Sequence, residues 1–167
     1  MRVEELYERW SLQRVHLGYF GLWVVSVVDA LGLGGLGFII TWDRTTTAIG
    51  SYSVPKRLMH GLGVPGGETM LVWGIALMVI AGLVLAVLAV PTWNGWTPRL
   101  ILTWRGYAMA LCGLMWVLWS AMFTSYAIGH RGVGLIGGLS WAVIATGAIA
   151  ASLTWTGYAH NPRPRPV

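Results

Sequence analysis

Residues Leu17 to Ile40 read LGYFGLWVVSVVDALGLGGLGFII, and this stretch decides the fold class. Its 24 residues would reach about 36 Å as an α-helix, and about 20 mostly apolar residues are enough to cross a bilayer core roughly 30 Å thick. One acid, Asp29, stands near the midpoint of the stretch. A carboxylate at that depth costs on the order of 2.5–3.5 kcal/mol, so Asp29 needs either a structural partner or a function.

The whole chain has the composition of a membrane protein. Hydrophobic residues make up 56% of its 167 residues and charged residues only 10%, whereas soluble domains average about 25% charged residues. Three further long apolar runs follow the first. We therefore expect an all-α integral membrane protein, a four-helix up-down-up-down bundle with spans at about residues 17–40, 70–90, 100–128 and 133–158.

The two ends of the chain differ from the spans. Residues 1–16 place Val3, Leu6, Tyr7 and Trp10 at helical spacing, which predicts an amphipathic interfacial helix before the first span. Residues 159–167 form a basic tail that prolines interrupt, and we expect it to be extended.

The longest connection, residues 42–69, is predicted to be an ordered outer loop. Ser53 and Pro55 predict the start of a short helix, and Gly61 predicts its end. The basic residues of that helix are expected near headgroups or a partner: Lys56, Arg57 and His60.

The second half of the first span is rich in glycine, at residues 32, 34, 35 and 37. Two interpretations are open. The span continues as one helix, which we favour, or this half unwinds or re-enters the membrane, which is tolerated only where protein or water covers the backbone.

Basic residues predict the orientation. With both termini inside, seven Lys and Arg residues face the cytoplasm and four face outward, which favours cytoplasmic termini in the inner (cytoplasmic) membrane. The seven are Arg2, Arg9, Arg14, Arg99, Arg105, Arg163 and Arg165, and the four are Arg44, Lys56, Arg57 and Arg131. Arg105 is expected to snorkel to the surface. The net charge of +5 is better matched by anionic lipid than by nucleic acid.

Small residues at four-residue spacing indicate helix packing. They form one stripe in the first span, at Ser26, Ala30 and Gly34, and another in the fourth span, at Gly134, Gly138 and Ala142. The fourth span is the richest in small residues and contains no charge. This pattern predicts a homo-oligomer or a membrane protein partner.

Asp29 is the one acid inside a span and therefore the one candidate for ion or proton chemistry. A buried carboxyl can exchange a proton near neutrality. We favour the alternative, in which it is held by hydrogen bonds that fix helix register. The donors expected at similar depth are Trp116, Ser120 and Thr146.

Signatures of enzymes and cofactors are missing from the sequence. There is no GxSxG, no HExxH and no phosphate loop, and the single cysteine, Cys112, cannot form a redox pair. No two histidines stand at ligand spacing on one helix. We expect no catalysis, no metal and no cofactor.

Two stretches give the chain a resemblance to known proteins. The turn Pro65-Gly66-Gly67 leads into Trp73-Gly74, and PTWNGWTPR follows at residues 91–99. Over residues 40–105 the chain resembles small four-pass membrane proteins of actinobacteria and their phages. Those encoded by phages include holin-like lysis proteins and proteins that exclude competing phages, so the resemblance implies a role of that kind.

An acid in the first span is similar to that of small multidrug-resistance transporters, where it carries the coupled proton. This chain is longer and lacks matching motifs around Asp29, so that role is not carried over. The expected function is association with itself or with other membrane proteins. The alternative is a small proton- or cation-coupled transporter or channel that uses Asp29.

Overall fold

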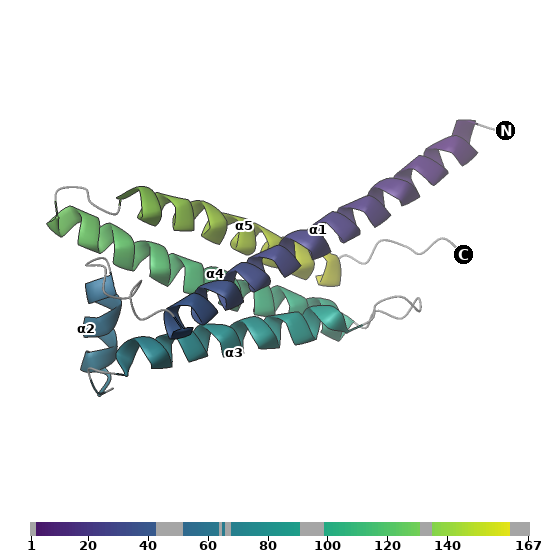
Figure 1. Ribbon diagram of the computed structural model, residues 1–167. Coiled ribbons are helices and arrows are strands. Elements are labelled where there is room, and N and C mark those ends of the chain that lie inside the picture. Colours follow the sequence, from purple (N-terminus) through teal and green to yellow (C-terminus); the bar gives the residue numbers. More distant parts are fainter. Residues whose placement is uncertain are drawn as a thin grey trace.

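The structure is a computed structural model that describes residues 3–42, 52–63, 65, 68–90, 99–130 and 135–160, with side chains from residue 18 onward. Within these ranges every regular element is a helix (Figure 1). The helices are α1 (Val3–Trp42), α2 (Ser53–Gly61), α3 (Thr69–Ala89), α4 (Arg99–Gly129) and α5 (Leu135–His160).

Four of these helices are long and apolar enough to cross a membrane, where the sequence predicts spans. The four segments are Gly18–Trp42, Thr69–Ala89, Arg99–Gly129 and Leu135–His160. Ala159 and His160, which were expected to belong to the extended tail, are the last two residues of α5. Residues 161–167 lie outside the described residues.

Helix α1 is one uninterrupted helix of 40 residues. The glycine-rich half stays helical as far as Trp42, so the favoured interpretation of that half is confirmed. The expected separate interfacial helix over residues 1–16 does not form, because residues 3–16 continue into the apolar segment without a break. At 1.5 Å per residue the helix is about 60 Å long, about twice a bilayer core.

The long helices pack as two antiparallel pairs, α1 with α3 and α4 with α5, and fewer contacts join one pair to the other (Figure 1). In the first pair, a Cβ placed on Gly37 would lie 2.7 Å from the Gly74 carbonyl oxygen. In the second, a Cβ on Gly113 would lie 3.0 Å from Ile149 Cγ1. Only glycine permits such close approach of the backbones.

Buried residues follow one register in all four long helices. In α3 they recur at alternating steps of four and three residues, at Met70, Gly74, Leu77, Ala81, Val84 and Leu88. The same steps occur in α1, at Ser26, Ala30, Leu33, Gly37 and Ile40. A repeat that averages 3.5 residues keeps one face toward its neighbours and is typical of left-handed helix packing.

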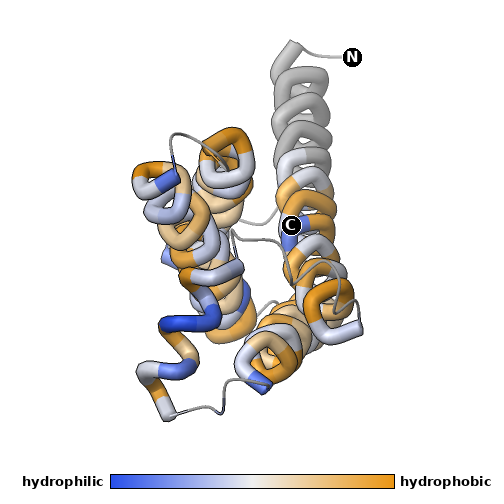
Figure 2. The backbone as a smooth tube through the Cα atoms, turned by 60° about the vertical axis from the view of Figure 1, so that its left-hand side comes forward, coloured by the Kyte–Doolittle hydropathy of each residue, from blue (hydrophilic) through white to orange (hydrophobic). Residues whose placement is uncertain are grey.

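The short helix α2 lies crosswise at the end of the bundle where α3 begins and α4 ends (Figure 1). We call this the α2 end. Helix α2 forms where the sequence predicts a short helix, although Tyr52, and not Ser53, occupies the cap position. Apolar colours surround the long helices in Figure 2, whereas α2 includes strongly hydrophilic residues.

Candidate functional site

Asp29 lies on α1 between the buried positions Ser26 and Leu33, and its side chain is half-buried. It faces α4. One turn further along α1, a Cβ on Gly32 would lie 3.6 Å from Trp116 Cζ2 of α4. The acid therefore points into the contact between the two helix pairs and not away from the protein.

None of the three expected donors reaches the buried Oδ2 atom of Asp29, which has no hydrogen-bond partner among the described residues. Ser120 Oγ donates instead to the Gly138 carbonyl oxygen at 2.7 Å, because Ser120 is on the side of α4 that faces α5. Thr146 is exposed and its hydroxyl donates to the Ala142 carbonyl oxygen at 2.9 Å, one turn earlier in its own helix. The prediction of these two partners is wrong.

Trp116, the third expected donor, does lie near Asp29 but without a hydrogen bond. Its ring is 2% exposed and stacks on Trp141 with centroids 5.0 Å apart. The indole Nε1 is buried and meets no acceptor in the described part of the chain. Asp29 Oδ2 and Trp116 Nε1 are thus both buried without a hydrogen-bond partner among the described residues, and a buried polar group without a partner costs free energy.

A cluster of aromatic side chains closes the α2 end. Tyr52, at the start of α2, packs edge-on against Trp119 and Phe123 of α4, with centroids 6.0 and 5.7 Å away. Trp73 of α3 stacks on Trp119 at 5.9 Å. Burial raises the pKa of Tyr52 above its ordinary value of 10.0, because the neutral phenol is favoured away from water. This cluster fixes α2 to the bundle.

The opposite end of the bundle is built around Arg105. Its side chain is only 3% exposed, so the prediction that it snorkels to the surface is wrong. The guanidinium donates from Nη2 to the carbonyl oxygens of Leu88 at 3.1 Å and Val90 at 2.8 Å, and lies 5.0 Å above the Trp155 ring. A cation at the carboxyl end of α3 is favoured by the helix dipole, which is why Arg105 turns inward.

Arg99 makes a similar contact with α5. It donates from Nε to the Ala159 carbonyl oxygen at 3.0 Å and from Nη2 to that of His160 at 3.3 Å. The first two turns of α4 therefore supply donors to the last turns of both neighbouring helices. The sequence predicted both arginines to be charges on the cytoplasmic side and Arg105 to snorkel to the surface. It did not predict that they donate hydrogen bonds to the ends of neighbouring helices.

Most of the residues that were predicted to pack against other helices lie at helix contacts. Ser26 and Ala30 are fully buried, and a Cβ on Gly34 would lie 3.2 Å from Ala81 Cβ of α3. On α5, Gly138 is buried against Thr124 of α4. Ala142 is half-buried, and Gly134 lies outside the described residues.

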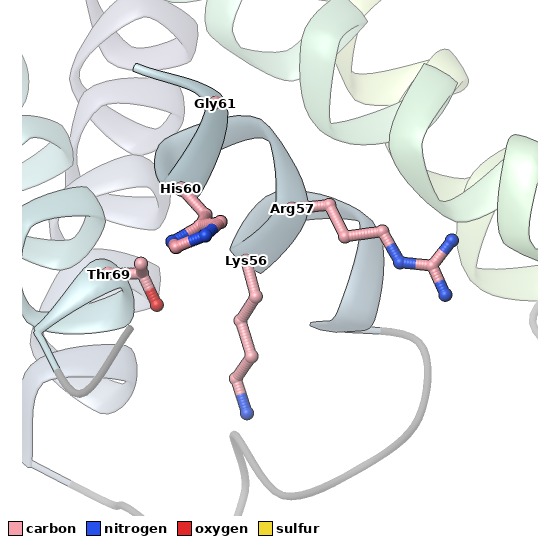
Figure 3. A pocket seen from close by; sticks show the side chains of 5 residues that line it. All are labelled: Lys56, Arg57, His60, Gly61 and Thr69. Atoms are coloured by element: carbon pink, nitrogen blue, oxygen red, sulfur yellow. The ribbon is translucent and has the colours of Figure 1, made fainter. Parts of the chain in front are cut away.

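A basic pocket lies between α2 and the start of α3 (Figure 3). It has a volume of about 460 Å³ and is lined by the three predicted basic residues together with the last residue of α2 and the first residue of α3: Lys56, Arg57, His60, Gly61 and Thr69. The His60 ring and the Thr69 side chain lie opposite one another, whereas Lys56 and Arg57 extend in different directions from α2 (Figure 3). The three basic residues thus all line the pocket, but the side chains of Lys56 and Arg57 do not converge.

These features define a helical protein with four potential membrane spans, a half-buried acid in the first of them and a basic pocket at one end. Over the described ranges, no three His, Cys, Asp or Glu side chains are close enough together to hold a metal ion. Comparison with protein-family models, with curated proteins and with solved structures finds no match.

Proposed function

We propose that this chain is a four-pass integral protein of the cytoplasmic membrane that acts by association, with itself or with other membrane proteins, and not by catalysis. The four long apolar helices support the membrane assignment. The antiparallel packing of α1 with α3 and of α4 with α5 supports an up-down-up-down topology. The excess of basic residues on the side of the termini, seven against four, supports cytoplasmic termini.

The observation that carries the proposal is a second register of small residues on α5, on the side away from the bundle. Five of its positions are exposed and small: Ser140, Gly147, Ala150, Thr154 and Gly157. With the exposed Val143 they recur at alternating steps of three and four residues, the spacing that a packed helix requires. No described atom lies within 4 Å of a Cβ placed on Gly147 or Gly157.

The outward face of α3 is different. It carries Leu71, Ile75, Val79 and Leu83, with exposed fractions of 43 to 59%. Bulky aliphatic side chains suit lipid, whereas small residues let another helix approach closely. The hydroxyls of Ser140 and Thr154 already donate to carbonyl oxygens of their own helix at 2.9 and 2.7 Å. The α5 face is therefore compatible with lipid before association and with a helix after it.

Disulfide cross-linking tests this proposal. In a Cys112→Ala background, we expect Gly147→Cys and Gly157→Cys to give cross-linked dimers in native membranes. The matched controls are Val79→Cys and Leu83→Cys on the outward face of α3, which should remain monomeric. Equal cross-linking at all four positions would mean that contacts are random, and the proposal would fail.

The finer role that we propose is that of a holin-like or superinfection-excluding protein of phage type. A holin-like protein forms large homo-oligomers and depolarises cells when expressed. An excluding protein leaves the membrane potential intact and protects the cells against infection. Measuring potential and phage plating on the same cells separates the two roles.

A second candidate function rests on Asp29, whose buried Oδ2 and the Trp116 indole N–H face the same helix contact without partners among the described residues. Of the two groups, the carboxyl can take up a proton or a small cation, whereas the indole N–H can only donate a hydrogen bond to it. If Asp29 carries a coupled ion, Asp29→Asn should abolish flux in proteoliposomes while the protein still inserts. Unchanged flux, or none in the wild type, would refute transport.

A further inference from the structure

Exposed aromatic side chains lie near the ends of the long apolar helices, and aliphatic side chains cover the surface between them. In the described part of the chain, the exposed Phe, Tyr and Trp side chains have exposed fractions of 37 to 79%: Phe20, Trp23, Phe38, Trp42, Trp104 and Tyr107. Between Trp23 and Phe38 of α1, and along the whole of α3, the large exposed side chains are Val, Leu and Ile. Across these two stretches Asp29 is the one charged residue.

One group of the exposed aromatic residues lies at the end of the bundle opposite α2. Trp23 donates from Nε1 to the Leu88 carbonyl oxygen at 3.1 Å, and Arg105 donates to the same oxygen at 3.1 Å. Trp23 and the aromatic residues on either side of Arg105 therefore lie at the level where α3 ends. Phe20 stacks on Trp23 with centroids 6.5 Å apart and belongs to this level. We call this group the first belt: Phe20, Trp23, Trp104 and Tyr107.

A second group lies at the α2 end. Phe38 and Trp42 stack on each other with centroids 5.9 Å apart. They directly follow Gly37 and Thr41, the two residues of α1 that a Cβ on Gly74 would meet. Gly74 is in the second turn of α3, so this pair lies at the level where α3 begins. We call Phe38 and Trp42 the second belt.

The distance between the belts matches the thickness of a bilayer core. The centres of the Phe20–Trp23 and Phe38–Trp42 pairs are about 28 Å apart along α1, at 1.5 Å per residue. The hydrocarbon core of a bilayer is roughly 30 Å thick. Trp and Tyr are enriched at both membrane–water interfaces, because their rings are apolar and their N–H and O–H groups are polar. The aliphatic surface between the belts suits acyl chains.

Helix α1 continues well beyond the first belt. Residues 3–17 are helical and join the apolar segment without a break, and they extend past the ends of the other long helices (Figure 1). This extension is about 22 Å long. Its sequence contains five charged residues: Glu4, Glu5, Glu8, Arg9 and Arg14. An unbroken helix that crosses a bilayer points away from the membrane where it leaves it, whereas a helix that lies on the surface needs a bend.

We propose that the bilayer contacts the protein between the two belts, and that residues 3–17 stand out of the membrane into water. The aromatic rings of the belts then lie in the headgroup regions of the two leaflets, and Asp29 lies near the middle of the bilayer. The inference rests on the membrane assignment proposed above, and it adds where the bilayer lies. It does not depend on association through α5.

Depth measurement by electron paramagnetic resonance tests the position of the belts. Single cysteines in a Cys112→Ala background carry a nitroxide label, and the full-length protein is placed in liposomes. Oxygen, which concentrates among acyl chains, and a water-soluble nickel chelate compete to relax the label. Val79 is at the midpoint of α3 and exposed, so Val79→Cys should report a position about 14 Å deeper than Trp42→Cys and Trp104→Cys. Equal depth at all three positions would overturn the inference.

The same measurement tests the extension. The variants Trp10→Cys, Ser11→Cys, Leu12→Cys and Gln13→Cys together cover one full turn of helix. A helix that stands in water should give all four labels the same high contact with the nickel chelate. A helix that lies on the membrane would shield the labels on one side and expose them to oxygen, which would overturn the inference.

The outcomes separate this inference from the membrane assignment. If Val79→Cys reports water, the membrane assignment fails and the inference fails with it. If Val79→Cys lies deep while any label of the extension is shielded, only the inference fails. Leu83→Cys, on the same face of α3 one turn later, is the matched control and should also lie deep. Circular dichroism of each variant should match the wild type, so that a change of depth is not a loss of fold.

Discussion

Trp155 of α5 donates a hydrogen bond from Nε1 to the hydroxyl oxygen of Ser26 on α1, at 3.0 Å, and both residues are fully buried. Ser26 in turn donates to the carbonyl oxygen of Leu22 at 2.8 Å. The bond connects the α1–α3 pair to the α4–α5 pair, between which there are fewer contacts than within each pair. It is therefore a place where the cohesion of the two pairs can be measured.

The first prediction concerns this bond. In a double-mutant cycle of Ser26→Ala and Trp155→Phe, we expect a coupling energy of about 0.6–1.7 kcal/mol, the range for hydrogen bonds between membrane helices. Unfolding in mixed micelles, followed by circular dichroism, gives the free energies. Ser140→Ala is the control, because Ser140 bonds within its own helix; its cycle with Trp155→Phe should show no coupling. A coupling near zero for Ser26 would contradict the prediction.

The second prediction concerns Arg105. Arg105→Met removes the charged donor from the Val90 carbonyl oxygen, and we expect the free energy of unfolding to fall by about 1–3 kcal/mol. Arg105→Lys keeps the charge but not the planar donor set, so it should lose less. Thermal unfolding in detergent provides the measurement. Arg99→Gln, at an exposed arginine of the same helix, should cost less than Arg105→Met; an equal loss would argue against a special role for burial.

The third prediction compares two glycines of α3. A Cβ on Gly74 would collide with Thr41 Oγ1 and lie 2.7 Å from the Gly37 carbonyl oxygen, which accepts the Thr41 hydroxyl. Gly74→Ala should therefore destabilise the protein by about 1–3 kcal/mol. Gly82→Ala on the same helix meets no described atom within 4 Å and should change stability by less than about 1 kcal/mol. Stability measured in the same micelles tests both, and similar effects would contradict the α1–α3 contact.

The fourth prediction is a pH dependence at the α2 end. Because burial raises the pKa of Tyr52 above 10.0 in the folded protein, the stabilisation from the neutral phenol is complete below the pKa of the unfolded chain. It is lost as the pH rises through the folded value. We expect the melting temperature of the wild type to fall more steeply above pH 10 than that of Tyr52→Phe. Parallel curves would show that Tyr52 does not contribute.

The helices were predictable because their signal is length and composition. About 20 apolar residues suffice to predict a span, and all four long helices lie where such runs occur. The faces of the helices were not predictable in the same way. In α3 the buried Leu77 and Val84 and the exposed Leu83 and Val79 are chemically alike, so hydrophobic periodicity carries no information about which side meets protein.

Spacing explains the partial success of the small-residue stripes. Steps of four residues drift by about 40° per step around a helix. Gly138 of the α5 stripe is therefore buried, whereas Ala142 is half-buried. The observed faces follow a 3.5-residue average instead. The prediction of hydrogen-bond donors to Asp29 failed for a related reason. Residues at the same depth in the membrane can point in different directions around their helices.

Arg105 also has a consequence for how the proposed membrane protein is made. An arginine at the centre of a lone helix in lipid costs on the order of 2.5–3.5 kcal/mol; Arg105, in the second turn of α4, costs less than that but still needs acceptors. Its acceptors, the carbonyl oxygens of Leu88 and Val90, lie at the end of the segment synthesised just before. We therefore expect α3 to wait beside the translocon until α4 has been threaded, so that the two enter the bilayer together as a helical hairpin.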